Sequence, residues 1–199
     1  MIVRKIFSVE TGHVVRNCST DRCKYSQHGH SAKIELFFES RFLDNAGMVM
    51  DFGLMKSDVK GFIDALDHCY LFCSAEEEEF RNFHKKYNRR WIELPFIPSA
   101  EMLSIFIFRF IDRIISHTIF GNGEREVSLK SVRYHETETC YAECSRDDAD
   151  RYLGGSFGEV YKSITFSEGV TKDFSETLLA KLGGKHIENK AVEQQIKLH

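Results

Sequence analysis

Alternating apolar and polar positions mark the first part of the chain as rich in β-strands. Residues 2–9 and 31–39 alternate with a period of two and predict two strands, which the polar segment 16–27 connects. Residues 48–52 follow a turn-rich stretch and predict a third, short strand. Histidines stand at or near the ends of the first two strands, so any site that they form is expected at one edge of a sheet.

Helical spacing of apolar residues takes over further along the chain. It predicts one helix at residues 54–66 and a second at 102–116, with Ser99 as the N-cap of the second. Between them, residues 72–97 are expected to be an irregular insertion. Its acidic and basic residues suit a solvated helix, with a partner-binding face as the alternative. A further strand is expected at residues 127–135.

This order of elements, β-β-β-α-α-β, predicts an α+β fold with an antiparallel sheet that carries both helices on one face. We expect one domain at residues 1–144, which contains the insertion, and a C-terminal extension at 145–199. In the extension the pattern weakens. It is expected to hold a strand at 160–166, a short amphipathic helix at 173–182, and frayed last residues.

Composition narrows the class of protein. A net charge of -3 gives no basic excess, so we expect no nucleic-acid partner. We also expect no membrane partner and a cytoplasmic location, since neither a signal-peptide pattern nor a run of eighteen apolar residues is found. In that compartment the six cysteines are expected to stay reduced. Four of them are expected in the core or at the surface rather than as metal ligands: Cys69, Cys73, Cys140 and Cys144.

A His-x-His pair suggests a metal site. Residues two apart on a strand share a face, so His28 and His30 can bind one ion, and His13 at the end of the preceding strand can supply a third imidazole. Three histidines with an open fourth position are typical of catalytic zinc. A closed structural zinc site built from Cys18, Cys23, His28 and His30 is the alternative.

Several motifs occur together in an order that resembles the 6-pyruvoyltetrahydropterin synthase and 6-carboxytetrahydropterin synthase family, over residues 5–142. They are Phe7-Ser-Val-Glu-Thr-Gly-His13, Cys23 followed by His28-Gly-His30, Gly47-Met-Val-Met-Asp-Phe52, Leu66-Asp-His68, Pro98-Ser-Ala-Glu101, and Glu136-Thr137.

The resemblance implies a tunnelling fold, in which each subunit has a four-stranded antiparallel sheet with two helices on one face. It also implies rings of subunits with active sites at their interfaces, commonly a homohexamer made of two trimers. The implied substrate is 7,8-dihydroneopterin triphosphate, which loses triphosphate and, in the carboxy branch, acetaldehyde. That branch leads to 7-deazaguanine compounds such as queuosine.

The resemblance also implies roles for individual residues. Zn²⁺ would be held by His13, His28 and His30 and would stabilise negative charge on the substrate. Cys23 would be the catalytic base, and Asp67 with His68 a proton relay.

Glu136 would anchor the pterin, because a carboxylate accepts two hydrogen bonds from its amino and ring N–H edge, and the family also assigns it to the relay. Ser99 and Glu101 would line the same pocket, although capping and a first-turn acid also explain them.

The chain departs from the family pattern in ways that concern substrate preference. Four residues separate Cys23 from His28, one more than is usual in bacterial members, which makes Cys18 the fallback thiol. Ser99 replaces the usual threonine, and residues 145–199 lie outside the resemblance. The alternatives are therefore a pyruvoyl-forming or related pterin lyase and, in another class, a catalytically silent zinc-binding scaffold.

Overall fold

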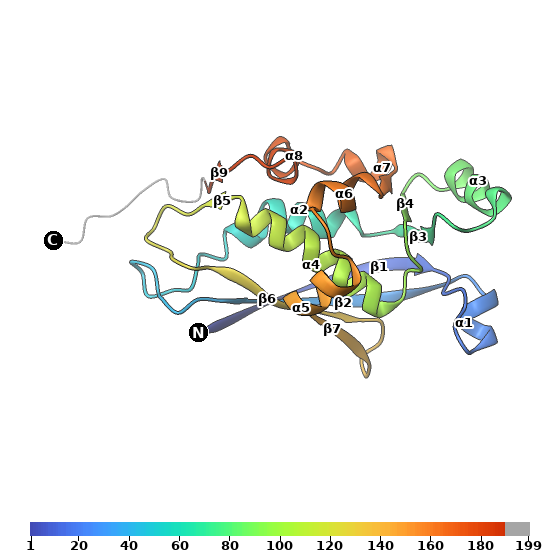
Figure 1. Ribbon diagram of the computed structural model, residues 1–199, viewed down its shortest axis with the longest axis horizontal. Helices are drawn as coiled ribbons and strands as arrows, with labels where there is room; N and C mark the ends of the chain where they lie inside the picture. The colour runs from blue at the N-terminus through green and yellow to red at the C-terminus, as the bar shows by residue number, and fades with distance from the viewer. Residues whose placement is uncertain (190–199) are drawn as a thin grey trace.

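The computed structural model describes residues 1–189 and has one main sheet with helices packed on it (Figure 1). Its elements in chain order are β1 (Ile2–His13), α1 (Asp21–Tyr25), β2 (His28–Glu39), the 3-10 turn η1 (Leu54–Lys56), α2 (Asp58–Ala65), β3 (Cys69–Cys73), α3 (Glu78–Tyr87), β4 (Trp91–Leu94), α4 (Ala100–Ser116), β5 (Thr118–Ile119), β6 (Ser128–His135), β7 (Tyr141–Ser145), α5 (Arg146–Tyr152), α6 (Phe157–Lys162), β8 (Thr165–Phe166), α7 (Glu168–Thr171), α8 (Glu176–Leu182) and β9 (Ile187–Glu188).

The α+β class is confirmed, but the prediction of four strands is wrong. The main sheet has seven strands in the order β7-β6-β2-β1-β3-β4-β8. Strands β7, β6, β2 and β1 form an antiparallel unit, in which β1, β2 and β6 correspond to predicted strands and β7 was not predicted. Beyond them, β3 runs parallel to β1, β4 runs parallel to β3, and β8 closes the edge antiparallel to β4. Strand β4 lies in the insertion and β8 in the extension, whereas β3 begins before the insertion and overlaps only its start.

Helices α2 and α4 cover one face of the sheet, as the sequence predicts (Figure 1). Alternate side chains of β1 and β2, such as Val9 and Ile34, enter the core, where the apolar stripe of α4 includes the fully buried Phe106 and Phe110. Ser99 caps α4 by accepting a hydrogen bond from the amide of Met102, so the predicted cap is confirmed. This packing fixes the hairpin whose end carries the histidines.

The strand predicted at residues 48–52 is absent among the described residues. The side chain of Asp44 accepts hydrogen bonds from the amides of Ala46 and Met48, so the chain turns where extension was expected. The following helix is also interrupted, because Ser57 adopts a non-helical conformation between η1 and α2. The apolar content of residues 48–52 therefore did not reveal that the Asp44 side chain holds the chain in a turn.

The insertion is ordered, which corrects the expectation of irregular structure. Strands β3 and β4 flank the exposed helix α3, and Tyr70 points away from the main core to stack on His84 of α3, with ring centroids 3.9 Å apart. The basic side chains of α3 do not pair along the helix as predicted: Arg81 and Lys85 bind Glu93 of β4 at 3.0 and 2.7 Å. The strands were missed because they are short and lack alternation.

The extension packs on the same side of the sheet as α2 and α4. The prediction of a strand at 160–166 is wrong in its first half, which is the end of α6, a helix that starts at a capping box formed by Ser156 and Glu159. Only the short strand β8 remains of the prediction. The predicted helix at 173–182 is confirmed as α8, which starts later, at the cap Ser175. The expectation of frayed last residues concerns 190–199, outside the described residues.

All six cysteines are free thiols, as expected. Over residues 1–189, none of the helices combines the length and the apolar character needed to span a bilayer.

Candidate metal centre and active site

The pairing of β1 with β2 brings three histidines to one end of the sheet. His13 lies opposite His28, and Thr11 lies opposite His30. Directly paired residues and residues two apart share a face, so all three imidazoles project together. A ligand nitrogen of each ring lies within 4.8 Å of those of the other two, and Nε2 of His13 is 3.1 Å from Nε2 of His30.

Backbone carbonyls orient two of these rings. Nδ1 of His13 donates to the Pro98 carbonyl at 2.7 Å, and Nδ1 of His28 donates to the Ser26 carbonyl at 2.9 Å. Donation from Nδ1 fixes the tautomer in which Nε2 carries the lone pair. Both rings are therefore prepared to coordinate through Nε2. Pro98 belongs to a motif that is visible in the sequence, but this use of its carbonyl is visible only in the fold.

His13 is held in the neutral form. Its residue is 2% exposed, and burial is the main reason that its pKa falls to about 4. The hydrogen bond to Pro98 opposes this effect, whereas the charges of His28 and His30 lower the pKa further. A metal ligand must be unprotonated, so His13 is ready to bind an ion at neutral pH without losing a proton.

This donor set fits zinc. Tetrahedral Zn²⁺ with Zn–N bonds of about 2.0–2.1 Å separates its nitrogen ligands by about 3.4 Å, close to the observed spacing. Within residues 1–189 this is the one group of three or more His, Cys, Asp or Glu side chains placed to hold a metal. The four-residue structural site that includes Cys18 and Cys23 is thus not formed, and the ligand set stays open to further partners.

Glu136 lies beside the histidines. It follows β6, and its Oε1 is 3.6 Å from Nε2 of His13, with 27% of the side chain exposed. The sequence did not predict this proximity. It places a carboxylate next to the metal centre, where the side chain can bind substrate or influence the ligands.

Asp67 and His68 form the expected pair where α2 meets β3. Nδ1 of His68 donates to Oδ2 of Asp67 at 2.9 Å, while Oδ1 of Asp67 accepts from the amide of Glu10 at 2.7 Å. Burial raises the pKa of Asp67, but the hydrogen bonds from Glu10 and His68 and the charge of His68 outweigh it, so the pKa lies below its usual value. The carboxylate is therefore ionised and can orient the imidazole.

His68 lines an open hollow at the surface. The backbone of His68 has φ of 56°, in the left-handed region, and its amide donates to the Glu10 carbonyl at 2.7 Å. The hollow of about 410 Å³ is lined by His30 and His68 and also by Thr11 and Tyr70. Strand alternation places Glu10 and Ser31, which also line this hollow, on the opposite face of the hairpin from the three imidazoles, so this chain does not bring His68 and the histidine cluster into one pocket.

Cys23 lies outside the histidine cluster. It sits on α1, partly exposed, and its carbonyl accepts a hydrogen bond from the amide of Val15. Cys18, the fallback thiol, bonds only within its own loop, to Thr20. Glu101 is exposed in the first turn of α4, and Ser99 serves as that helix's cap.

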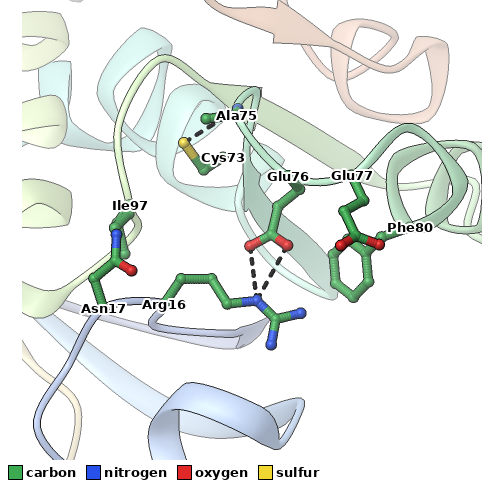
Figure 2. A pocket seen from close by; sticks show the side chains of 8 residues that line it. All are labelled: Arg16, Asn17, Cys73, Ala75, Glu76, Glu77, Phe80 and Ile97. Atoms are coloured by element: carbon green, nitrogen blue, oxygen red, sulfur yellow. Dashed lines mark hydrogen bonds and ion pairs between the residues drawn. The ribbon is translucent and has the colours of Figure 1, made fainter.

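A second hollow, of about 450 Å³, adjoins the segment that carries Cys23. Figure 2 shows the guanidinium of Arg16 against both carboxylate oxygens of Glu76, each 3.1 Å from Nε. Arg16 also donates to the Lys24 carbonyl, next to Cys23, at 2.7 Å. This link between the thiol segment and the insertion was missed, because neither residue belongs to a recognisable motif.

The chain is similar to proteins of known family. A family model described as 6-pyruvoyl tetrahydropterin synthase matches residues 2–147. The 6-carboxy-5,6,7,8-tetrahydropterin synthase of Helicobacter pylori strain J99 is 34% identical over 185 residues, covering 90% of this chain and 92% of that protein. The protein with the same name from Aquifex aeolicus is 28% identical and covers 71% of this chain and 95% of that one.

The similarity to the Helicobacter protein extends past residue 147, since it covers 90% of the chain. Among solved structures, an uncharacterized protein from Wolinella succinogenes has a TM-score of 0.59 at 18% identity, covering 73% of this chain and 98% of that one. The 6-pyruvoyl tetrahydropterin synthase of Caenorhabditis elegans has a TM-score of 0.51 at 17% identity, covering 73% of this chain and 94% of that one. At these identities the solved structures show a shared fold.

Proposed function

This chain belongs to the 6-pyruvoyl tetrahydropterin synthase family, and on that premise we propose that it is a zinc-dependent 6-carboxy-5,6,7,8-tetrahydropterin synthase. It converts 7,8-dihydroneopterin triphosphate with release of triphosphate and acetaldehyde, on the route to queuosine and other 7-deazaguanine compounds. The name of the Helicobacter relative, matched over most of both chains, supports the carboxy product.

One observation carries the metal part of the proposal: the convergence of His13, His28 and His30, with two Nδ1 atoms held by carbonyls. These three side chains would hold Zn²⁺. When bound, zinc supplies a Lewis acid that polarises the oxygens of the substrate side chain. The fixed tautomers of His13 and His28 keep the ligand geometry from drifting during turnover.

The proton transfers are assigned to three side chains. Cys23, as a thiolate, removes a proton from a carbon of the substrate side chain. Asp67 orients His68, and His68 exchanges a proton with the substrate or with the thiol. Cys23 lies on α1 and not in the histidine cluster. Its role as the base therefore requires that the substrate side chain extends from the histidines to the thiol.

Substrate binding is assigned to Glu136, Ser99 and Glu101. The carboxylate of Glu136 accepts two hydrogen bonds from the amino and ring N–H edge of the pterin. Its position 3.6 Å from His13 supports a bound pterin close to the metal centre. Ser99 and Glu101 contact the substrate from the start of α4.

We further propose the assembly and compartment of the protein. It forms a homohexamer of two trimers with active sites between subunits, and residues 1–144 act as the synthase domain that the extension 145–199 supplements. It works in the cytoplasm, where the thiol of Cys23 stays reduced. Light scattering coupled to size-exclusion chromatography measures the subunit number.

Product analysis tests the function. The zinc-loaded protein is incubated with 7,8-dihydroneopterin triphosphate, and the pterins and acetaldehyde are identified by mass spectrometry. A 6-carboxy pterin with acetaldehyde supports the proposal. A 6-pyruvoyl pterin without acetaldehyde favours the activity for which the family is named. Unchanged substrate contradicts an enzyme of this class and leaves a zinc-binding scaffold.

A further inference from the structure

Arg90, at the end of the insertion, uses every N–H donor of its guanidinium. Nε donates to the Asp67 carbonyl at 2.8 Å, and Nη2 donates to the carbonyls of Asp64 and Ala65 at 3.2 and 2.9 Å. Nη1 donates to the Gly169 carbonyl at 2.6 Å and to Oδ2 of Asp173 at 2.7 Å. A guanidinium has five such donors, so none is left over, and no lysine can reproduce the arrangement.

Three of these bonds hold the turn from which the relay projects. The carbonyls of Asp64, Ala65 and Asp67 lie at or just beyond the C-terminal end of α2, where the last carbonyls of a helix lack the usual partners four residues on; that of Asp64 also accepts from the Asp67 amide at 3.0 Å. The next residue, His68, takes the left-handed conformation with φ of 56°. A non-glycine residue keeps this conformation only where its surroundings enforce it, and Arg90 supplies part of that enforcement.

The other two bonds join the same guanidinium to the C-terminal extension. Gly169 lies so close to β4 that a Cβ added there would stand 2.2 Å from the Arg89 carbonyl. Ser167 fixes the contact from both sides: its Oγ accepts from the Trp91 amide at 3.0 Å, and its amide donates to the Trp91 carbonyl at 3.0 Å. The extension is therefore fitted to the backbone next to Arg90.

We propose that Arg90 is a positioning residue for the Asp67–His68 pair, and that the extension, through Gly169 and Asp173, holds Arg90 in place. The insertion and the extension thereby stabilise the turn at Asp67 and His68 together, through Arg90. This inference rests on the proposed function, since it assumes that Asp67 and His68 serve turnover. It gives the two segments outside the four-stranded unit a common task.

Arg109 offers a matched control. It is also an arginine, 13% exposed, that joins the domain to the extension, through Oδ1 of Asp150 at 3.1 Å and the Gly155 carbonyl at 2.7 Å. It lies on α4 and makes no hydrogen bond to the turn at Asp67. Loss of a contact with the extension is thus common to both variants, whereas loss of the relay turn is specific to Arg90.

The test compares steady-state kinetics of Arg90→Lys, Arg109→Lys, Asp67→Asn and the double variant Arg90→Lys/Asp67→Asn on 7,8-dihydroneopterin triphosphate. Misplacing the relay predicts that Arg90→Lys lowers kcat by about tenfold or more and changes KM by less than about threefold. Arg109→Lys should keep kcat within about twofold of the native value. The double variant should be no slower than Asp67→Asn, because both changes act on the same step.

Additive losses in the double variant, or equal losses in the two arginine variants, would overturn the proposal, since both results indicate general destabilisation. If the native protein does not turn over this substrate, the proposed function has failed. Hydrogen exchange then tests separately whether Arg90 holds the turn at Asp67 and His68. The His68 amide, bonded to Glu10, should exchange faster in Arg90→Lys than in Arg109→Lys. Equal exchange rates at that amide in the two variants would contradict the positioning role of Arg90 as well.

Discussion

The buried imidazole of His13 makes the stability of the metal-free protein depend on pH. Its pKa falls from 6.5 to about 4 on folding, chiefly because burial disfavours the imidazolium. The pKa is thus lower in the folded state, and the unfolded chain takes up the proton first as the pH falls. The stabilisation is complete above pH 6.5 and is lost as the pH falls towards 4.

The size of the effect follows from the gap between the two pKa values. At about 1.4 kcal/mol per pKa unit, it amounts to about 3 kcal/mol in full, and to about 2.5 kcal/mol between pH 7.5 and 4.5. The reference variant is His13→Asn, which cannot titrate in this range but keeps an N–H donor for the Pro98 carbonyl. Titrating groups that do not interact with His13 are shared by both proteins and cancel in the comparison, whereas the charges of His28 and His30 are part of the effect measured.

The assay is urea unfolding followed by circular dichroism, in the presence of a chelator, at several pH values. The difference in unfolding free energy between the native protein and His13→Asn should shrink by about 2.5 kcal/mol from pH 7.5 to 4.5. A difference that stays constant would refute the claim that His13 is held neutral. With zinc restored, the dependence should steepen, because protons compete with the metal for the ligand nitrogens.

Further predictions concern the extension, the thiol and the pterin anchor. Asp58→Ala should lower the unfolding free energy, measured by urea unfolding, by about 3–5 kcal/mol, because it leaves the ammonium of the buried Lys181 without its partner at 2.9 Å. Adding Lys181→Met to this variant should restore most of the loss. Cys23→Ala should lower kcat by about 10²–10⁴-fold in acetaldehyde release, whereas Cys18→Ala should retain turnover; the reverse would move the base to residue 18. Glu136→Gln should weaken substrate binding, seen as a higher dissociation constant in calorimetry, with zinc content unchanged; lost zinc would show that the carboxylate serves the metal instead.

The convergence of the three histidines could be predicted from sequence because it depends on contacts within one pair of strands. His28 and His30 are separated by one residue on a strand, and the alternation of both strands predicted a pairing that brings His13 to them. The Asp67–His68 pair was found for a similar reason, since the two residues are adjacent. What the sequence could not provide was the Pro98 carbonyl that orients His13, because that contact joins segments far apart in the chain.

The errors in the fold predicted from sequence have physical causes as well. Strands β3 and β4 are short and largely buried, so they lack the alternation that reveals an exposed strand. The turn at Asp44 is held by a side chain and replaces a strand that apolar content alone suggested. Arg90 carried no motif, and its importance is visible only where α2, β4 and the extension meet.

Zinc content and acetaldehyde release, measured on the same sample, test whether the protein is a zinc-dependent pterin lyase built on three histidines. The native protein should hold about one zinc per chain, lose turnover on chelation and recover it when zinc is returned. The His28→Ala variant should neither hold zinc tightly nor recover turnover. Turnover that survives chelation, or zinc that remains bound in His28→Ala, would contradict the claim.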